Sequence, residues 1–436
     1  MAAIKIAYIG GGSTRAPAVT RGIIERAEAF AGSEVVLIDL DEDHLDVILR
    51  LSRRMAESAG ADITFSATTD RRAGLRDADI VLTSFRPGGF EARRQDELIP
   101  LRHGVIGQET QGPGGFFMAL RAIEALKPML DDMNAVCPNA ILLNYTNPVN
   151  IVAQAVASYA QRQVISLCEG PIIFPREVAE AAQLDPEQLD VTMIGLNHGS
   201  WSIHHEHAGD DLIEKVRAAF QERAQDPGMT AQERRLLHMT ATFGSVPAQY
   251  FKYYYFRDEI LAELQSSPTS RAEDITADVP DQWAHYAEQA DASNPALDPA
   301  RCRGGMDLLE IAVDVMDAIA NDKAEVWPVN VPNCGAIQGL ADDLVVEVPG
   351  LVGRRGARPI ASGPVPANVQ GLVAALASYQ LLTAEAAWHG SREMAVQALA
   401  ANPLVPSLPV AEALYAEMAQ AQSAHLPARL VDGGGG

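Results

Sequence analysis

Short apolar runs alternate with amphipathic stretches along the first third of the chain. The predicted strands are residues 4–9, 35–38, 80–83 and 140–143, and the predicted helices are about 18–31, 43–60 and 117–135. Strands that alternate with helices in this way are typical of βαβ units, which place parallel strands in one sheet. A parallel sheet is covered by helices on both faces, which explains why the strands are continuously apolar.

The pattern changes after about residue 150. Further strands are predicted at 164–167 and 191–194, and the region 212–325 is mainly helical, with polar loops at 224–230 and 265–300. Short strands return around 324–349, and the last helices are predicted at about 366–399 and 410–423. We therefore predict two domains in an α/β chain: a doubly wound parallel sheet of the Rossmann type in residues 1–165, followed by a mixed α+β domain in residues 166–436.

Composition and charge narrow the classes of partner. The chain has 436 residues, of which 47% are hydrophobic and 21% charged, as in ordinary globular proteins. Its formal net charge is −23, from 57 acidic and 34 basic residues. A surface this acidic repels nucleic acids and anionic membranes, so we expect neither as a partner. An anionic substrate would need a local cluster of arginines to overcome this field.

The cysteines indicate the compartment. Cys137, Cys168, Cys302 and Cys334 are widely spaced and form no CxxC pair, so they predict no disulfide framework. The first strand begins almost at the first residue, which leaves no room for a signal peptide. No apolar run is long enough to span a bilayer. We expect a cytoplasmic protein.

A glycine turn follows the first strand directly. Gly10, Gly11, Gly12 and Ser13 stand there, before a helical stretch, where a backbone turn can approach a pyrophosphate at a helix N-terminus. The third glycine of the G-x-G-x-x-G fingerprint is missing, because Arg15 occupies its position. Asp39, at the end of the second strand, is placed to bind the ribose hydroxyls of NAD and to repel NADP. The alternative interpretation is a structural glycine turn with a solvated Asp39.

Polar segments follow two other strands. Arg86 comes straight after a buried strand, and a later strand runs into Asn144 and Asn147. In an open α/β sheet these positions face the ligand crevice. The segment Gly107–Gly115 places polar side chains among four glycines, which favours a binding loop over a core element. Turn capping is the alternative role for the two asparagines.

Three further residues carry candidate chemistry. Cys168 and His198 each end a predicted strand and are followed by glycine within two residues. A lone cysteine or histidine is usually structural, but a thiolate and an imidazole at strand exits can bind Mn, Fe, Co, Ni or Zn and leave positions open for substrate. The aromatic run Tyr250–Phe256 is most simply a packing surface, although one tyrosine can act as a base beside a metal.

Taken together, these motifs resemble glycoside hydrolase family 4, whose members depend on NAD and a divalent metal. The resemblance spans nearly the whole chain and rests on the following segments: GGGST at 10–14, DELIPLRHGVIGQET at 96–110, GPGG at 112–115, NYTNP at 144–148, GLNH at 195–198, YFKYYYF at 250–256, VPNCGAI at 331–337 and DDLVVEVPGLVG at 342–353. It implies a fold like that of lactate and malate dehydrogenases.

The resemblance also implies a mechanism outside the two-carboxylate scheme. NAD removes hydride from C3 of the sugar, and a metal held by Cys168 and His198, most often Mn(II), acidifies the C2 proton. Tyr250 matches the base that takes this proton. Elimination then expels the C1 substituent, water adds, and the hydride returns.

Substrate roles follow by the same resemblance. Asn147 matches an amide of the substrate and metal site, and Arg93 and Arg271 fall where 6-phosphoglucosidases bind the phosphate, with Ser13 as a further candidate.

Glu169 stands where α-specific members have aspartate, which acts as acid for the leaving group, and where β-specific members have asparagine. We expect a 6-phospho-β-glucosidase in which Glu169 is the acid or binds a substrate hydroxyl. An α-specific enzyme and one for unphosphorylated glycosides remain alternatives. Family members tend to be homodimers or homotetramers.

Two interpretations compete with a glycosidase. A 2-hydroxy-acid dehydrogenase shares the nucleotide fold but needs a histidine–carboxylate pair and no metal. A non-catalytic sensor of NAD or a sugar phosphate would keep the glycine turn and would require neither Cys168 nor Tyr250.

Overall fold

The computed structural model describes residues 3–160, 162–223, 225–303 and 310–431 of the chain. Its main sheet consists of β1 (Lys5–Ile9), β2 (Ser33–Ile38), β3 (Ile63–Thr68), β4 (Ile80–Thr83), β5 (Ile141–Asn144), β6 (Val164–Ser166), β7 (Leu189–Leu196), β8 (Gly199–His207), β9 (Asp210–Asp211), β10 (Glu325–Pro332), β12 (Val345–Gly353) and β13 (Gly356–Pro359). Two short strands, β11 (Ile337–Gln338) and β14 (Gly363–Pro364), pair separately.

The order of strands confirms the predicted architecture. The first six strands are parallel in the order β3-β2-β1-β4-β5-β6, which is the doubly wound Rossmann order. The sheet then continues through β10, β12, β7, β8 and β9, which are antiparallel to their neighbours. Parallel and antiparallel parts are thus joined in one sheet, between β6 and β10.

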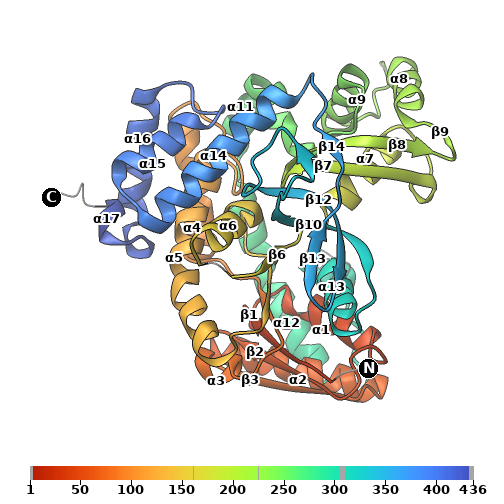
Figure 1. Cartoon of the computed structure of the whole chain (residues 1–436), viewed down its shortest axis with the longest axis vertical. Helices are drawn as coiled ribbons and strands as arrows, with labels where there is room; N and C mark the ends of the chain where they lie inside the picture. Colours follow the sequence, from red (N-terminus) through yellow and green to blue (C-terminus); the bar gives the residue numbers. More distant parts are fainter. Residues whose placement is uncertain (1–2, 161, 224, 304–309, 432–436) are drawn as a thin grey trace.

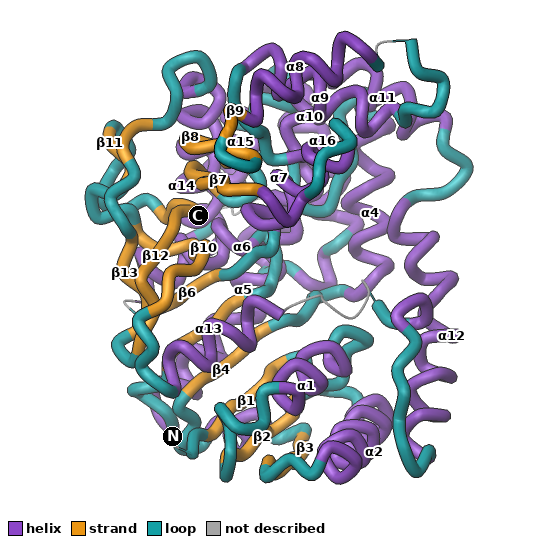
Figure 2. The backbone as a smooth tube through the Cα atoms, turned by 90° about the vertical axis from the view of Figure 1, so that its right-hand side faces the viewer, coloured by secondary structure: helices purple, strands orange, loops and turns teal. Residues whose placement is uncertain are grey.

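The helices cover both faces of this sheet (Figures 1 and 2). They are α1 (Ala16–Glu25), α2 (Glu42–Ala59), α3 (Arg71–Leu75), α4 (Gly89–Arg102), α5 (Gly112–Val136), α6 (Val149–Ala155), α7 (Gly170–Ala181), α8 (Leu212–Glu222), α9 (Ala231–Phe243), α10 (Lys252–Tyr255), α11 (Arg257–Ser266), α12 (Arg271–Asp291), α13 (Glu310–Ala320), α14 (Gln370–His389), α15 (Arg392–Ala401), α16 (Leu408–Ala421) and α17 (Ala428–Val431).

Strand β1 shows how the core is divided. Ile6 and Tyr8 enter one hydrophobic cluster, and Ala7 and Ile9, which alternate with them, enter another on the opposite face. All four side chains are buried. A strand that buries both faces is continuously apolar, as the sequence pattern indicated.

The predicted loop at 265–300 is wrong in its centre, where α12 runs from Arg271 to Asp291. The helix begins with a capping box, in which the Ser270 hydroxyl accepts from the Glu273 N–H and the Glu273 carboxylate accepts from the Ser270 N–H. Its buried face includes Gln282 and His285 beside apolar residues, so the apolar stripe that usually reveals a helix is broken.

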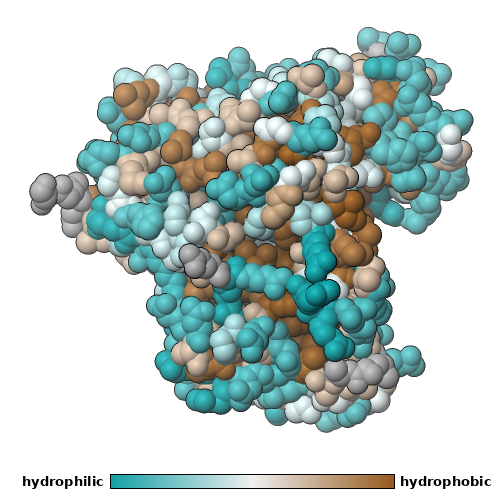
Figure 3. Space-filling model, viewed as in Figure 1, coloured by the Kyte–Doolittle hydropathy of each residue, from teal (hydrophilic) through white to brown (hydrophobic). Residues whose placement is uncertain are grey.

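Other boundaries also differ. The predicted helix at 18–31 ends at Glu25, and the single helix at 366–399 is two helices, α14 and α15, separated at Gly390, where φ is +37°. Within the described residues, no helix is both long and apolar enough to cross a bilayer. The face shown in Figure 3 is mainly hydrophilic at its periphery, and hydrophobic side chains gather in its middle.

Candidate active site

The glycine turn after β1 is shaped by close approach of its neighbours. Gly10 has φ +97°, and a Cβ there would lie 2.1 Å from the carbonyl oxygen of Ser84, which follows β4. A side chain at Gly10 is therefore excluded twice, by conformation and by space. The Gly12 N–H donates to Asp39 Oδ2 at 2.9 Å, which fixes the carboxylate at the end of β2 beside the turn.

A cavity of about 680 Å³ opens on this turn. It is lined by six of the seven predicted cofactor residues: Gly10, Gly12, Ser13, Asp39, Arg86 and Asn147. The seventh, Gly11, packs closely against Leu37 instead. A Cβ at Gly11 would lie only 2.8 Å from the Leu37 Cβ, so a larger residue does not fit there. We call this space the nucleotide cavity. Its volume lies within the usual range for small-molecule sites, and its glycine backbone and carboxylate are the groups that a dinucleotide requires.

Cys168 and His198 meet beside the carboxyl end of β6. Cys168 follows β6, and His198 lies in the tight turn between β7 and β8, with φ +57°. The Cys168 Sγ and His198 Nε2 atoms are 3.7 Å apart. One ion bound at about 2.0 to 2.3 Å to each atom would span this separation, so the pair fits a shared metal.

Neighbouring groups orient both candidate ligands. Thr110 Oγ1 lies 3.1 Å from His198 Nδ1, which leaves Nε2 facing the cysteine. The Gly170 N–H, in the first turn of α7, donates to Cys168 Sγ at 3.3 Å. Such contacts behind the ligands fix the orientation of a metal site.

Burial keeps both groups neutral in the absence of an ion. It lowers the pKa of His198 to about 3 and raises the pKa of the Cys168 thiol. The imidazole is thus ready to coordinate, and the thiol gives up its proton when a cation binds. In the described ranges no cluster of three or more His, Cys, Asp or Glu residues is arranged for a metal.

Tyr250 lies directly on this pair. Its ring stacks on the His198 ring with centroids 3.7 Å apart and planes 10° apart, and it also contacts the rings of Phe174 and Tyr253. It belongs to the short 3₁₀ turn Gln249–Phe251 that precedes α10. Burial raises the pKa of Tyr250 well above its usual value, so a cation beside it is needed before the phenol can act as a base.

Glu169 lies between the Cys168–His198 pair and the nucleotide cavity. The Tyr145 hydroxyl, whose side chain lines that cavity, donates to Glu169 Oε1 at 2.8 Å. Glu169 stands between Cys168 and the first residue of α7, so its carboxylate is anchored within one residue of the candidate metal ligand.

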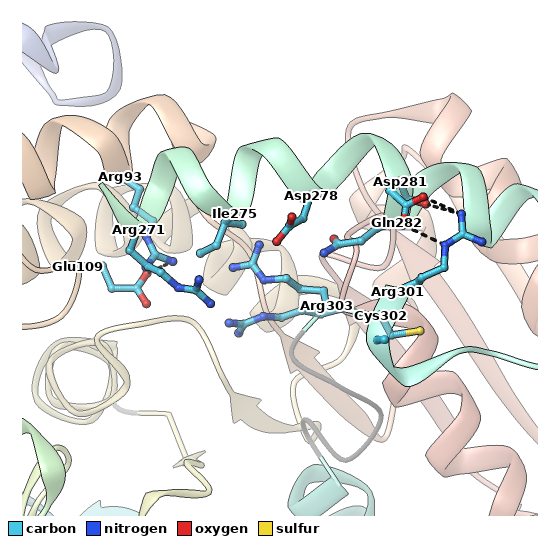
Figure 4. Close-up of a pocket in the computed structure, with 12 residues that line it drawn as sticks. Arg93, Glu109, Arg271, Ile275, Asp278, Asp281, Gln282, Arg301, Cys302 and Arg303 are labelled. Atoms are coloured by element: carbon cyan, nitrogen blue, oxygen red, sulfur yellow. Dashed lines mark hydrogen bonds and ion pairs between the residues drawn. The ribbon is translucent and has the colours of Figure 1, made fainter. Parts of the chain in front are cut away.

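A second cavity, of about 370 Å³, contains an arginine cluster (Figure 4). The predicted phosphate residues Arg93 and Arg271 both line it, together with Arg15 and Arg303, which were not predicted. We call it the arginine cavity. Figure 4 shows the guanidinium groups of Arg271 and Arg303 pointing into the same space from α12 and from the segment after it.

Glu109 balances part of this positive charge. It forms ion pairs with Arg86 at 2.5 Å and with Arg93 at 3.0 Å. Burial alone would raise the pKa of Glu109, but Arg86, Arg93 and Arg15 outweigh it and hold the pKa at about 2. Because Thr110, the next residue, contacts His198, the arginine cavity is also connected with the metal pair.

Comparison with known proteins decides the family. Residues 5–184 match the family 4 glycosyl hydrolases, and residues 193–405 match the C-terminal domain of the same family. The chain belongs to family 4 of the glycosyl hydrolases. The predicted family and the prediction of a glycosidase are confirmed, so the dehydrogenase and sensor interpretations are not retained.

Relatives of this family 4 enzyme share its full length. The chain is 37% identical to the probable 6-phospho-beta-glucosidase of Bacillus subtilis, with 97% of each chain covered. It also resembles a solved 6-phospho-alpha-glucosidase from gut microorganisms in complex with NAD and Mn²⁺, at 26% identity and a TM-score of 0.85, covering 98% of this chain and 99% of that one. The 6-phospho-beta glucosidase of Thermotoga maritima with manganese, NAD⁺ and glucose-6-phosphate aligns at 28% identity and a TM-score of 0.85, covering 97% and 99%.

The predicted dehydrogenase-like architecture is confirmed as a likeness of fold. The malate dehydrogenase of Plasmodium falciparum aligns with a TM-score of 0.51 at 12% identity, over 88% of this chain and 99% of that chain. An identity this low supports the arrangement of strands and helices and carries nothing about chemistry.

Several residues of the family 4 site had no individual prediction. Glu109 and Thr110 lie in the glycine-rich segment that the sequence singled out, and Tyr145 lies in the NYTNP motif, so a signal was present for all three. Arg303 comes from a segment that no pattern distinguished, and only its position in space brings it to the site.

Proposed function

We propose that this family 4 enzyme hydrolyses 6-phospho-β-glucosides with NAD and Mn(II), by oxidation at C3, deprotonation at C2 and elimination. The observation that carries the proposal is the arginine cavity, which is connected through Glu109 and Thr110 with the Cys168–His198 pair. A phosphate site beside a metal site matches a phosphorylated sugar. Relatives named as 6-phosphoglucosidases, two of them solved with NAD and a metal, support it.

The chain offers a binding site for each cofactor. The nucleotide cavity would hold NAD, with Asp39 at the ribose and Arg86 and Asn147 at the strand exits. Cys168 and His198 would hold the metal. When bound, NAD supplies a hydride acceptor at C3 and Mn(II) supplies a Lewis acid that acidifies the neighbouring C2 proton. In this proposal residues 1–165 bind the nucleotide, and residues 166–436 supply the metal pair and the base.

Arg93 and Arg271 bind the 6-phosphate in this proposal. Guanidinium groups offer paired N–H donors that match a phosphate. The net charge of −23 makes such a local cluster necessary for a substrate that carries a dianion. Four of the five arginines that line the arginine cavity supply it: Arg15, Arg93, Arg271 and Arg303.

Tyr250 takes the C2 proton. Its ring is held flat against His198, so its hydroxyl cannot move far from the metal pair. Burial raises the pKa of the phenol, and a cation held by Cys168 and His198 would lower it to a range in which Tyr250 serves as a base. Asn147, at the exit of β5, binds a sugar oxygen at the same site.

Glu169 serves the leaving group or a substrate hydroxyl. Tyr145 holds one of its oxygens, and this phenol also touches the nucleotide cavity. The β anomer is proposed because the curated relative from Bacillus subtilis, at 37% identity, carries that name. An α-specific structure at 26% identity makes the other anomer the main competing outcome.

The test compares four nitrophenyl substrates: the α- and β-glucosides, each with and without a 6-phosphate. The protein is incubated with NAD, Mn(II) and reductant, and nitrophenol and NADH are measured together. The proposal predicts that nitrophenol is released fastest from the 6-phospho-β-glucoside without net NADH. Preference for an α or an unphosphorylated substrate would overturn the proposed specificity.

A matched Glu169→Gln variant should lose more activity on alkyl than on nitrophenyl aglycones if Glu169 is the acid.

A homodimer or homotetramer in the cytoplasm remains a prediction from the sequence resemblance. Size-exclusion chromatography with light scattering would measure the oligomeric state.

A further inference from the structure

Arg15 occupies the position where the dinucleotide fingerprint has its third glycine. That glycine normally allows close packing between the first helix and the sheet. Here Ala16 and Val19 of α1 are buried and provide that packing, while Arg15 lies before the helix at its N-terminal end. The Arg15 side chain lines both the nucleotide cavity and the arginine cavity. It therefore lies at the junction of the two spaces.

Arg303 lies at the same junction. It also lines both cavities, although 288 positions separate it from Arg15 along the chain. Its guanidinium carbon lies 5.0 Å from the centre of the Phe90 ring. The Nη1 atom is buried and has no hydrogen-bond partner among the described residues.

Other arginines of the arginine cavity are neutralised by carboxylates. Arg93 is paired with Glu97 at 2.7 Å and with Glu109 at 3.0 Å, and Arg301 is paired with Asp281 at 2.8 Å. Within the described part of the chain, Arg15, Arg271 and Arg303 form no such pair. Burial lowers the pKa of Arg303 to about 9, with smaller contributions from the neighbouring arginines Arg15, Arg86 and Arg93, and Glu109 acts in the opposite direction.

We propose that Arg15 and Arg303 are shared between two anions: the pyrophosphate of the dinucleotide on one side and the 6-phosphate of the sugar on the other. Each guanidinium has five N–H donors, so one side chain can donate to two phosphoryl groups at once. Arg271 lines the arginine cavity but not the nucleotide cavity, so it serves only the sugar phosphate. The inference rests on the proposed function, since it requires a phosphorylated sugar in the arginine cavity.

Sharing explains what an arginine contributes at position 15, where the dinucleotide fingerprint has a glycine. Each of the two arginines contributes to the affinity for both ligands, whereas a residue on one side contributes to one. A charge-assisted hydrogen bond to phosphate typically contributes enough for about a tenfold change in affinity when it is lost. The pattern of losses across variants therefore distinguishes a shared residue from a one-sided one.

The experiment measures two affinities separately by isothermal titration calorimetry, for NAD and for glucose 6-phosphate, on the full chain with Mn(II). Arg15→Met and Arg303→Met are expected to weaken both affinities by about tenfold each. Arg271→Met is expected to weaken glucose 6-phosphate alone. Arg301→Met, which removes an already paired arginine from the same cavity, is the matched control and should change neither affinity by more than about twofold.

The outcomes separate the inference from the proposed function. If Arg15→Met and Arg303→Met weaken only one ligand, sharing is wrong while the proposed function stands. If the wild-type protein binds NAD but no glucose 6-phosphate, the proposed function fails and sharing falls with it. Thermal melts check each fold. Arg15→Lys and Arg303→Lys keep the charge without the fork, and a partial recovery of both affinities supports sharing, whereas recovery of one contradicts it.

Discussion

At the scale of single residues, the chemistry of Cys168 and His198 depends on the groups behind them. Thr110 holds one nitrogen of the imidazole, and the Gly170 N–H points at the sulfur. The two candidate ligand atoms therefore face each other across 3.7 Å. A site prepared in this way loses little freedom when it binds a cation.

Replacing the sulfur tests this assignment. Cys168→Ser is expected to lower Mn(II) affinity and Mn-dependent turnover by about 100-fold or more, because a thiolate ligand is removed. NAD affinity should stay within about twofold, since Cys168 does not line the nucleotide cavity. Calorimetric titrations with Mn(II) and with NAD measure the two effects. Cys334→Ser, at an exposed cysteine, is the matched control, and equal Mn(II) affinities in both variants would contradict the ligand role.

Tyr250 allows a similarly narrow test. Tyr250→Phe keeps the ring that stacks on His198 and removes only the hydroxyl. We expect kcat to fall by about 10²- to 10⁴-fold with Mn(II) affinity unchanged, as for loss of a general base. Tyr255→Phe, in the same aromatic run but packed on Trp201 and Phe243, should retain activity. Steady-state kinetics of both variants decide it, and an active Tyr250→Phe enzyme would remove the tyrosine from the mechanism.

At the scale of elements, a buried carboxylate holds the turn that carries His198. Glu347 of β12 accepts from Asn197 Nδ2 and from Ser200 Oγ, both at 2.9 Å, on either side of that turn. Asn330 of β10 donates to the same carboxylate at 3.3 Å. Glu347 is 1% exposed, and Asn197, Ser200 and Asn330, which donate to it, are neutral side chains. It thus joins three strands beneath the site by hydrogen bonds.

Glu347 gives a pH-dependent prediction for stability. Burial raises its pKa from 4.5 to about 7. A raised pKa in the folded state stabilises the fold below about pH 4.5 and loses this contribution as the pH rises to about 7, because the ionised form is buried. Glu347→Gln should remove this slope and increase the free energy of unfolding at pH 8 by on the order of 2 kcal/mol.

Denaturant unfolding between pH 4.5 and pH 8 measures this slope. Glu347→Ala is the comparison, because it leaves Asn197 and Ser200 without their acceptor and should lower stability at every pH. Identical pH slopes for wild type and Glu347→Gln would show that Glu347 is ionised in the folded protein throughout this range.

The elements also show what the sequence pattern was able to reveal. Apolar runs such as Ile80–Thr83 are buried on both faces and were found within a residue or two. The amphipathic helix α2 was found because it buries a regular stripe. The helix α12 was missed, because polar residues such as Gln282 and His285 replace apolar ones on its buried face. Burial of polar side chains depends on partners far away in the chain, which a local pattern does not contain.

At the scale of the molecule, the sheet collects residues from distant segments. Gly10, Arg86, Asn147 and Cys168 follow β1, β4, β5 and β6, whose carboxyl ends lie at one edge because these strands are parallel. Their convergence was therefore predictable from the order of elements. Arg303 and Glu347 belong to the second half of the chain, where the sheet is antiparallel and the crossovers have no simple rule. Their place in the site required the structure.

The net charge of −23 acts on the same scale. It excludes a general attraction for anions, yet three arginines without ion pairs among the described residues line one cavity. The molecule thus combines an acidic surface with a local cationic site. This contrast favours recognition of a phosphate group within the cavity over attraction across the surface.

Loss of the C2 proton from the sugar during hydrolysis distinguishes the proposed elimination from a direct displacement at C1. The most direct measurement is hydrolysis of a 6-phospho-β-glucoside in D₂O with NAD and Mn(II), followed by nuclear magnetic resonance of the glucose 6-phosphate formed. Proton removal by Tyr250 and return of a proton from solvent predict deuterium at C2 of the product. Release of the aglycone with hydrogen fully retained at C2 would contradict elimination and would assign this enzyme a direct displacement at C1.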